Sequence, residues 1–436
     1  MLPTRRLFVG ALVAALLLGG AGEGPLWLFG ALCYVCALGG VVLLDWLRTP
    51  PPAALDVQRR VAARLSLGAD NPVEVVLRSR ARVHLRLLMR DEPPPDLPSS
   101  GEQQSVLLPA GGLITLRYTV CPWRRGAATF GRVNLRYRSL LGLFQRQAAY
   151  PLATPVKIYP NLHDARAYDL AARSGLLREA GLRRTRWQGS GSEFERLREY
   201  RPDDDYRRIN WPATARRGEP ITADYQVERA QNVLILLDVG RLMVAPVGPL
   251  SKLDHAVNTA LLLSYVCLRR GDNVGLLAFA DRVVAFVAPR GGQGQFSRLL
   301  ESLYSVSAHP VESDYARAFN EAALRVRRRS LVVTFTDVAD PDSCRLLIAA
   351  LARAAARHVP LCATLRDPVI EAYATAPIMG SPAVYERAVA HTLLEARAAT
   401  LRILRARGVL TVDVAADRLS PAVIDTYLRI KAQGRL

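Results

Sequence analysis

Residues 233–238 read Val-Leu-Ile-Leu-Leu-Asp, and residues 331–337 read Leu-Val-Val-Thr-Phe-Thr-Asp. Each stretch is a short apolar run that ends in polar residues, which is typical of a strand buried on both faces of a sheet. Helical patterns separate such runs and predict helices at 251–270, 293–305, 313–328, 342–357 and 382–407. Apolar strands that alternate with helices predict an α/β domain, doubly wound around a mainly parallel sheet, over residues 229–436.

Polar residues at the ends of these strands suggest where chemistry could take place. In an open parallel sheet, ligands bind beyond the carboxyl ends of the strands, where Asp238 and Asp337 stand. Ser313 and Asp314 open a helix and could add a third loop. Carboxylate and hydroxyl oxygens from separate loops suit a hard cation, so Mg²⁺ is the cofactor that these residues would hold. The alternative is that the carboxylates cap loops and helix N-termini, and the sequence leaves both interpretations open.

The N-terminus carries two apolar runs, at 7–21 and 26–44, with a turn between them. A membrane-spanning helix needs about 20 apolar residues, so the second run is long enough and the first is short. Arg5, Arg6 and Arg48 flank the pair, whereas the turn has no basic residue. The positive-inside rule then predicts a two-pass transmembrane hairpin over 1–48 in the plasma (inner) membrane, with the bulk of the chain cytoplasmic. The alternative is a cleaved signal peptide in the first run, which leaves the second run as the anchor.

Between the anchor and the α/β domain, two further regions differ in pattern. Residues 55–160 contain short runs in which apolar and polar residues alternate, for example at 73–77 and 113–120, and this predicts a small β-sandwich-like domain. Residues 161–228 form an arginine-rich connector.

Charge and cysteine content limit the classes of partner. The chain has 58 basic and 39 acidic residues, a net charge of +19, yet lysine occurs only at Lys157, Lys252 and Lys431. The arginines are spread along the whole chain without an aromatic-interleaved stripe, so an anionic membrane surface or an acidic protein is favoured over nucleic acid. The six cysteines show no disulfide framework, as expected in a reducing compartment.

The order strand, Asp238, helix, strand, Thr336-Asp337 resembles a von Willebrand factor A domain. In that family, a metal-ion-dependent adhesion site uses Asp-x-Ser-x-Ser after the first strand, a threonine in a second loop and an aspartate in a third. Asp238 and Asp337 match the two aspartates. Gly240 and Leu242 stand where the serines belong, and Ser313 is a stand-in for the threonine. The resemblance therefore implies a degenerate form of that site.

Residues 194–217 read Phe-Glu-Arg-Leu-Arg-Glu-Tyr-Arg-Pro-Asp-Asp-Asp-Tyr-Arg-Arg-Ile-Asn-Trp-Pro-Ala-Thr-Ala-Arg-Arg. This stretch resembles the signature of the bacterial "domain of unknown function 58" family, Tyr-x-x-Gly-Asp-x-x-Arg-x-Ile-Asp-Trp-x-x-x-Ala-Arg. The matching residues are Tyr200, Asp204, Arg207, Ile209, Trp211, Ala215 and Arg216. Asp203 replaces the glycine of the signature, and Asn210 replaces its second aspartate.

The signature residues also have a physical interpretation. Tyr200 and Trp211 offer large apolar surfaces with polar tips. The carboxylate of Asp204 can pair with guanidinium groups such as those of Arg207 and Arg216 through two hydrogen bonds. Three interpretations stay open: a clamp between the connector and the sheet, a surface that docks a partner, and a catalytic carboxylate among the aspartates of this stretch.

From these patterns we expect a membrane-anchored, non-enzymatic interaction scaffold with no catalytic residue and no small-molecule substrate. The family resemblance implies a MoxR-type AAA+ ATPase as the partner, in assembling or activating a complex. One alternative is a metal-dependent hydrolase that uses Asp238 and Asp337, although no general base is evident beside them. The other is a nucleic-acid-binding protein, which the net charge alone suggests.

Overall fold

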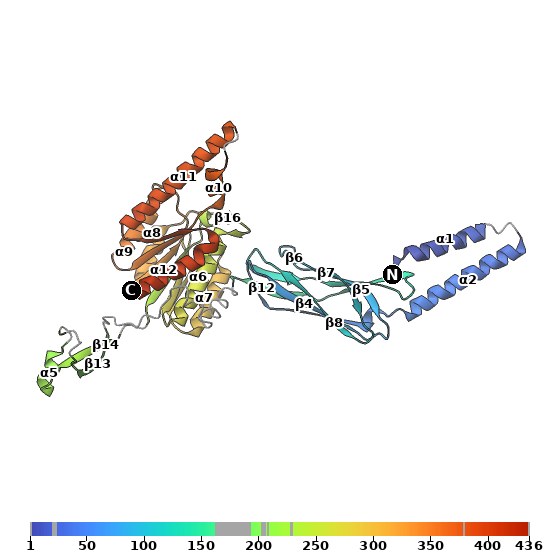
Figure 1. Ribbon diagram of the computed structural model, residues 1–436, viewed down its shortest axis with the longest axis horizontal. Helices are drawn as coiled ribbons and strands as arrows, with labels where there is room; N and C mark the ends of the chain where they lie inside the picture. The colour runs from blue at the N-terminus through green and yellow to red at the C-terminus, as the bar shows by residue number, and fades with distance from the viewer. Residues whose placement is uncertain are drawn as a thin grey trace. The chain divides into compact units, whose positions relative to one another are not determined.

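The computed structural model describes residues 2–19, 24–161, 193–201, 206, 209–226, 230–377 and 380–434. The chain divides into two compact units, Met1–Tyr159 and Pro160–Leu436. The first unit contains the apolar helices and the antiparallel strands, and the second contains the parallel sheet (Figure 1). The architecture is therefore mixed α/β with several sheets, one of them mainly parallel.

Two consecutive helices begin the first unit: α1 (Arg5–Gly19) and α2 (Pro25–Arg48). They pack against each other, and the indole Nε1 of Trp27 donates to the carbonyl of Leu17 at 2.8 Å. Among the described residues, one helical segment is long and apolar enough to cross a membrane: Leu26–Ala54, with a mean hydropathy of 2.2, which contains most of α2. The 15 residues of α1 are fewer than the roughly 20 that a span requires, so the structure does not support the two-pass topology.

Both ends of this helix pair contact one loop of the β-domain, residues 139–143. The carboxylate of Asp45, near the end of α2, is 1% exposed and accepts from the Ser139 hydroxyl at 2.5 Å and the Leu141 amide at 2.9 Å. The hydroxyl of Thr4, just before α1, donates to the carbonyl of Gly142 at 2.6 Å. These contacts tie the apolar helices to the β-domain through a buried carboxylate.

The strands of the first unit form three sheets. They are β1 (Leu2–Pro3), β2 (Leu55–Val61), β3 (Arg64–Ser66), β4 (Asn71–Ser79), β5 (Leu85–Asp91), β6 (Ser99–Ser100), β7 (Gln103–Leu108), β8 (Leu113–Val120), β9 (Gly126–Phe130), β10 (Val133–Arg138), β11 (Phe144–Tyr150) and β12 (Thr154–Tyr159). The orders are β1-β11-β10-β5-β7, β2-β4-β8-β6 and β3-β12-β9. The strands predicted at 73–77 and 113–120 lie within β4 and β8.

A buried ion pair joins two of these sheets. Arg59 of β2 pairs with Asp91 of β5, and their side chains are 1% and 0% exposed. The hydroxyl of Tyr118, on β8, donates to the same carboxylate at 2.7 Å. Arg59 also donates to the carbonyls of Leu152 and Gly131, at 2.5 and 3.1 Å, so its guanidinium is fully used inside the protein.

The described part of the second unit contains a small antiparallel strand pair ahead of its main sheet. Strands β13 (Glu193–Glu199) and β14 (Ile221–Gln226) pair, and the helix α5 (Trp211–Arg217) lies between them in sequence. The side chain of Asn210 caps α5 by accepting from the Ala213 amide at 3.1 Å. The helix ends at Gly218, whose φ of 77° favours glycine.

The main sheet of the second unit has the order β19-β18-β15-β20-β21-β22. Its strands are β15 (Asn232–Asp238), β18 (Asn273–Phe279), β19 (Val283–Arg290), β20 (Ser330–Phe335), β21 (Val359–Leu365) and β22 (Leu410–Val414). All neighbours are parallel except β18 and β19. Every residue of β20 and β21 is buried, as the unbroken apolar runs predict.

Helices cover both faces of this sheet (Figure 1). They are α6 (Lys252–Arg269), α7 (Gln293–Ser305), α8 (Tyr315–Arg325), α9 (Arg345–Ala355), α10 (Pro368–Thr375), α11 (Ser381–Ala406) and α12 (Ala416–Ala432). Helices α6, α7 and α12 pack together on one face, whereas α8, α9 and the C-terminal part of α11 cover the other. The short strands β16 (Pro246–Val247) and β17 (Leu250–Ser251) precede α6, whose first turn is fixed by a reciprocal capping box between Ser251 and Asp254.

A buried carboxylate connects α12 to the sheet. Asp272, just before β18, is 0% exposed and accepts from the Lys431 ammonium and the Tyr427 hydroxyl, at 2.6 and 2.5 Å. It also accepts from the Gln231 amide at 3.1 Å. Burial raises the pKa of Tyr427 far above its usual 10.0, and the charge of Asp272 adds to this effect, so the phenol remains a donor.

We predict that Asp272→Ala lowers the free energy of local unfolding of α12 by about 3–5 kcal/mol, because it leaves the Lys431 ammonium without its carboxylate. Hydrogen exchange of the α12 amides, in the full chain in detergent micelles, measures this loss. The matched control is Asp425→Ala, since Asp425 is 61% exposed and pairs with Arg429 at 3.6 Å. Such a surface pair contributes at most about 1 kcal/mol. Equal loss of protection in the two variants would contradict the interpretation.

Candidate functional site

The two aspartates at the predicted strand ends are brought together. Asp238 is the last residue of β15, Asp337 lies two residues beyond the end of β20, and these two strands are parallel neighbours. Asp238 is 1% exposed, and the side chain of Asp337 is 14% exposed. Asp238 is therefore buried and Asp337 largely shielded from water at one edge of the sheet, where each must be compensated from within the protein.

Neutral donors surround Asp238. Its Oδ1 accepts from the amide of Gly240 at 2.9 Å and from the Ser313 hydroxyl at 2.5 Å. Its Oδ2 accepts from the hydroxyls of Thr336 and Tyr315, at 2.6 and 2.9 Å. Burial, followed by the charge of Asp238, raises the pKa of Tyr315 well above its usual 10.0, which keeps the phenol protonated as a donor.

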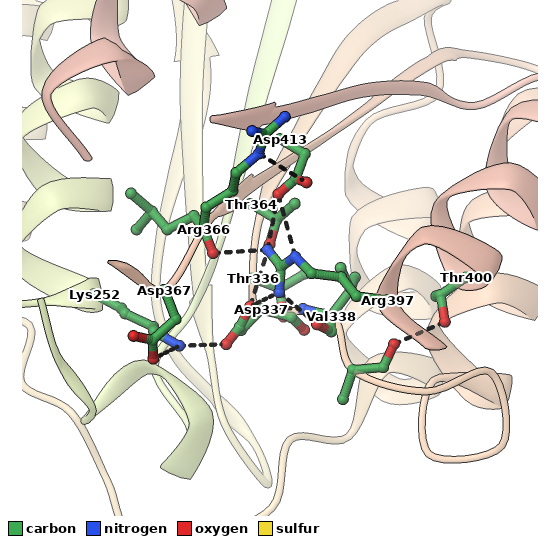
Figure 2. Close-up of polar contacts among 12 residues, drawn as sticks. Lys252, Thr336, Asp337, Val338, Thr364, Arg366, Asp367, Arg397, Thr400 and Asp413 are labelled. Atoms are coloured by element: carbon green, nitrogen blue, oxygen red, sulfur yellow. Dashed lines mark hydrogen bonds and ion pairs between the residues drawn. The ribbon is translucent and has the colours of Figure 1, made fainter. Parts of the chain in front are cut away.

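Positive charges surround Asp337 (Figure 2). The ammonium of Lys252, whose side chain is 7% exposed, lies 2.6 Å from Oδ2, and the guanidinium of Arg397 lies 2.8 Å from Oδ1. The hydroxyl of Thr364 and the amide of Val338 also donate to Oδ1, at 3.2 and 2.9 Å. Burial acts to raise the pKa of Asp337, but the charges of Arg397 and Lys252 outweigh it and lower the pKa below the ordinary 3.8.

Arg397 connects α11 to the ends of three strands (Figure 2). Beyond its bond to Asp337, it donates to Asp413 of β22 at 2.9 Å and to Thr364 of β21 at 2.6 Å. It also donates to the carbonyls of Val338 and Leu365, at 2.6 and 2.7 Å. A planar guanidinium presents several donors in a fixed fork, which makes it suited to bridging carboxylates and carbonyls on different loops.

Ser313 and Asp314 have different roles. Ser313 lies against Asp238, as the proposal of a third loop requires. Asp314 is exposed, and its side chain caps α8 by accepting from the Arg317 amide at 2.9 Å. Asp314 is therefore a helix cap, which is the alternative to metal binding that the sequence left open.

The residues at this edge do not fit Mg²⁺, which requires about six oxygen ligands in octahedral geometry. Both oxygens of Asp238 already accept two hydrogen bonds each, and both oxygens of Asp337 face a cationic side chain. At position 240, a serine would clash, because an added Cβ would lie 2.1 Å from the Ser313 hydroxyl and 2.9 Å from the Val311 carbonyl. Among the described residues, no group of three His, Cys, Asp or Glu side chains could hold a metal.

A cavity of 230 Å³ lies beside Asp238. It is lined by Arg241, Leu242, Glu312, Ser313, Tyr315, Ala339, Ser343, Cys344 and Leu346. Three large apolar side chains are exposed at or next to this cavity: Leu242 at 41%, Val311 at 37% and Leu346 at 61%. Exposed apolar side chains thus surround a cavity that is also lined by the polar side chains of Ser313 and Tyr315. We call Leu242, Val311 and Leu346 the rim of this cavity.

The signature residues lie partly outside the described residues, where Asp204 and Arg207 fall. Trp211 is the first residue of α5 and is 68% exposed, and Arg216 is exposed in the last turn of the same helix. Tyr200 is half-buried, and its amide donates to the carbonyl of Pro220 at 2.9 Å. Whether the signature forms a clamp or a docking surface stays a prediction.

Sequence patterns do not point to Lys252, Arg397 or Tyr315, which supply essential contacts of the site. Each comes from a helix that is far from the strand ends in sequence, with separations of 85, 60 and 77 residues from its carboxylate. One signal was available: lysine occurs at only three positions in this arginine-rich chain, and Lys252 is one of them.

A comparison with protein families identifies the region that contains this site. Residues 196–386 match the family described as "Protein of unknown function DUF58". The match covers the signature, β15, the Asp238 and Asp337 edge, and the beginning of α11. The resemblance in residues 194–217 is thus supported by an independent comparison, and the family description carries no function.

The matched relatives are uncharacterized proteins as well. The uncharacterized protein Rv1480 of Mycobacterium tuberculosis is 27% identical over 182 residues, which cover 41% of this chain and 56% of that protein. The uncharacterized protein YeaD of Bacillus subtilis is 24% identical over 209 residues, which cover 47% of this chain and 49% of that protein. The chain therefore spans about half the length of the curated relatives that it matches.

Among solved structures, the conserved hypothetical protein BatB from Bacteroides thetaiotaomicron aligns with 47% of this chain and 99% of its own. The sequence identity is 17% and the TM-score is 0.33. A FixG-related protein from Vibrio parahaemolyticus aligns with 24% of this chain and 96% of its own, at 9% identity and a TM-score of 0.18. Scores this low carry no argument about this chain.

We predict that Asp337 makes the stability of the α/β domain sensitive to acid. Its lowered folded pKa means that the stabilisation is complete above 3.8 and is lost as pH falls through that lower folded value. Asp337→Asn should cost about 3–5 kcal/mol at neutral pH and flatten the acid dependence. Thermal unfolding from about pH 7 to about pH 2 measures both effects. If Asp337→Asn unfolds with the same pH dependence as the native chain, Asp337 is not the group that makes the domain sensitive to acid. The control is Glu312→Gln, because the side chain of Glu312 is 86% exposed and its replacement should leave stability unchanged.

We further predict that Lys252→Ala creates a response to divalent cations that the native chain lacks. The Lys252 ammonium lies 2.6 Å from Asp337 and 3.8 Å from Asp367, so its removal leaves two carboxylates facing the vacated space. Mg²⁺ or Mn²⁺ should raise the unfolding temperature of Lys252→Ala, and neither should raise that of the native chain or of Lys252→Arg. Stabilisation of the native chain that disappears in Asp337→Asn would show that a metal, rather than the ammonium, compensates the carboxylate.

Proposed function

We propose that this chain is a membrane-anchored, non-enzymatic interaction scaffold whose C-terminal domain docks a partner at the carboxyl ends of its parallel strands. The observation that carries the proposal is the internal saturation of both strand-end carboxylates. The strand order, with an antiparallel edge strand β19, supports a von Willebrand factor A-like domain. The apolar helix α2 supports an anchor in the plasma membrane.

The hydrolase alternative requires a carboxylate that can reach a substrate and exchange protons with it. Asp238 is 1% exposed and accepts four hydrogen bonds from the protein, so it is positioned as a structural acceptor. Asp337 is held between an ammonium and a guanidinium that lower its pKa, which makes it a weak base. These arrangements favour a rigid surface over a reacting centre.

The same edge has the properties of a contact surface. Leu242, Val311 and Leu346 are exposed around a cavity of 230 Å³, and exposed apolar patches rimmed by polar residues mark interaction sites. Arg241 and Glu312 stand at the rim with side chains that are 63% and 86% exposed. Peripheral charges of this kind select a partner, while the apolar centre supplies most of the binding energy.

We propose a MoxR-type AAA+ ATPase as the partner, and this choice rests on the resemblance to the domain of unknown function 58 family. The apolar helix α2 would hold the chain in the membrane with the α/β domain on the cytoplasmic side, where ATP is available. The net charge of +19 is the single feature that favours nucleic acid, so that function is the alternative outcome of the experiment.

We predict that the full chain, solubilised from membranes, co-purifies with an AAA+ ATPase at moderate salt. Leu242→Asp with Leu346→Asp should reduce recovery of the ATPase about tenfold or more, because a charge would be buried in the contact. Leu324→Asp is the matched control, since Leu324 is 69% exposed on α8 and does not line this cavity. Recovery that is equal in both variants would contradict the docking face. Nuclease-sensitive association or substrate turnover abolished by Asp238→Ala would replace the proposal with one of its alternatives.

A further inference from the structure

Helix α11 extends well beyond the sheet that it covers (Figure 1). Among its described side chains before Thr400, only Ala390 is buried, whereas Thr400, Leu401 and Leu404 are all buried in its C-terminal part. The N-terminal half packs against α10. A helix that leaves half its length outside the core has a face available for another partner.

The N-terminal half of α11 carries a row of exposed apolar side chains, here called the stripe. Tyr385, Val389 and Leu393 are 73%, 40% and 50% exposed and follow one another at intervals of four residues, so they share one face of the helix. Tyrosine and leucine side chains at this spacing form the pattern by which two helices recognise each other. The stripe therefore has the pattern of a surface that packs against a second helix.

The stripe leads into a cavity of 350 Å³, because Leu393 belongs to both. The apolar residues that line this cavity include Ile370, Leu393, Leu394 and Leu401, and the charged ones are Lys252, Asp337, Arg366, Asp367, Glu371, Arg397 and Asp413. Both kinds come from α10 and α11, where Ile370 precedes Glu371 and Leu394 precedes Arg397 by three residues. A long side chain with an apolar stem and a polar end can therefore contact both kinds at once.

The charges of the cavity select a basic end group. Its seven charged residues comprise three cations and four carboxylates. The cations Lys252 and Arg397 are held by the deeper carboxylates, at 2.6 to 2.9 Å. The two carboxylates nearer the solvent, Asp367 at 25% and Glu371 at 42% exposure, have cationic partners only at 3.8 and 3.6 Å. Arg366, whose side chain is 50% exposed, stands beside Glu371, so the solvent-exposed part of the cavity carries two carboxylates against one cation in a chain of net charge +19.

We propose that α11 and this cavity form a second docking site, which takes an amphipathic helix of a partner protein that carries a lysine or arginine. The apolar face of that helix lies along Tyr385, Val389 and Leu393, and its basic side chain enters the cavity toward Glu371 and Asp367. This site is separate from the rim of Leu242 and Leu346, and it does not depend on which protein docks there.

The test uses a display library of helical peptides, selected on the full chain in lipid nanodiscs. Enriched peptides should carry apolar residues at intervals of four and one lysine or arginine beside them. Charge reversal of Glu371 should change the preference: selection on Glu371→Lys should enrich aspartate or glutamate at that position. Selection that ignores the charge of residue 371 would overturn the proposal.

The affinity of one enriched peptide, measured by fluorescence anisotropy, locates the contact. Leu393→Asp and Glu371→Gln should each weaken binding about tenfold or more, whereas Leu324→Asp should leave it unchanged. Leu242→Asp with Leu346→Asp should also leave it unchanged, which separates this site from the proposed function. Peptide binding that survives Leu393→Asp, or self-association of the chain through the stripe in place of peptide capture, would refute the assignment. Leu393 and Glu371 are half-exposed, so unfolding temperatures of these variants should match that of the native chain.

Discussion

A carboxylate that is removed from water must be compensated by donors or by charge, and two such groups stand side by side at the ends of β15 and β20. The protein compensates them in different ways. Asp238 takes four neutral donors from three loops, which fixes those loops relative to one another. Asp337 takes an ammonium and a guanidinium, which fixes two helices against the sheet. The shape of the whole edge follows from satisfying these two acids.

Through Arg397, the compensation of Asp337 also fixes the position of α11. Its guanidinium bonds to groups at the ends of β20, β21 and β22, so the middle of α11 has one position over the sheet. The half of α11 that precedes it then extends from a fixed point and packs against α10. A rigid helix that presents Tyr385 and Leu393 loses little conformational entropy when a partner binds, which favours affinity. The same buried network that stabilises the sheet edge therefore also prepares the proposed docking surface.

The sequence predicts the parts of this arrangement that depend on local pattern. The continuous apolar run 233–237 lies within β15, and Ser251 caps α6 as a helix start predicts. The sequence also predicts that Asp238 and Asp337 lie at the carboxyl ends of buried parallel strands. That β15 and β20 are neighbours in the sheet does not follow from it, because β18 and β19 lie between them along the chain. The partners of these acids do not follow, because periodicity says nothing about contacts 60 to 85 residues apart. Lysine is the exception: two of the three lysines, Lys252 and Lys431, pair with the buried Asp337 and Asp272. In a chain where arginine is the common cation, each of these two lysines thus stands against a carboxylate of the domain interior.

The compensation of Asp337 by Lys252 and Arg397, rather than by a metal ion, bears on the docking that we propose at this edge. A divalent cation with an open coordination position is completed by a carboxylate from a partner, which makes binding depend on the ion. Lys252 is part of the chain, its side chain is 7% exposed, and its ammonium already lies beside the carboxylates of Asp337 and Asp367. No position remains for an incoming carboxylate at that charge. In the proposed docking, recognition at this edge would come from the groups that stay exposed, which are the apolar side chains of Leu242, Val311 and Leu346 and the charges of Arg241 and Glu312. Binding through these groups requires no ion and would tolerate chelators, and its strength would depend on apolar contact area more than on salt.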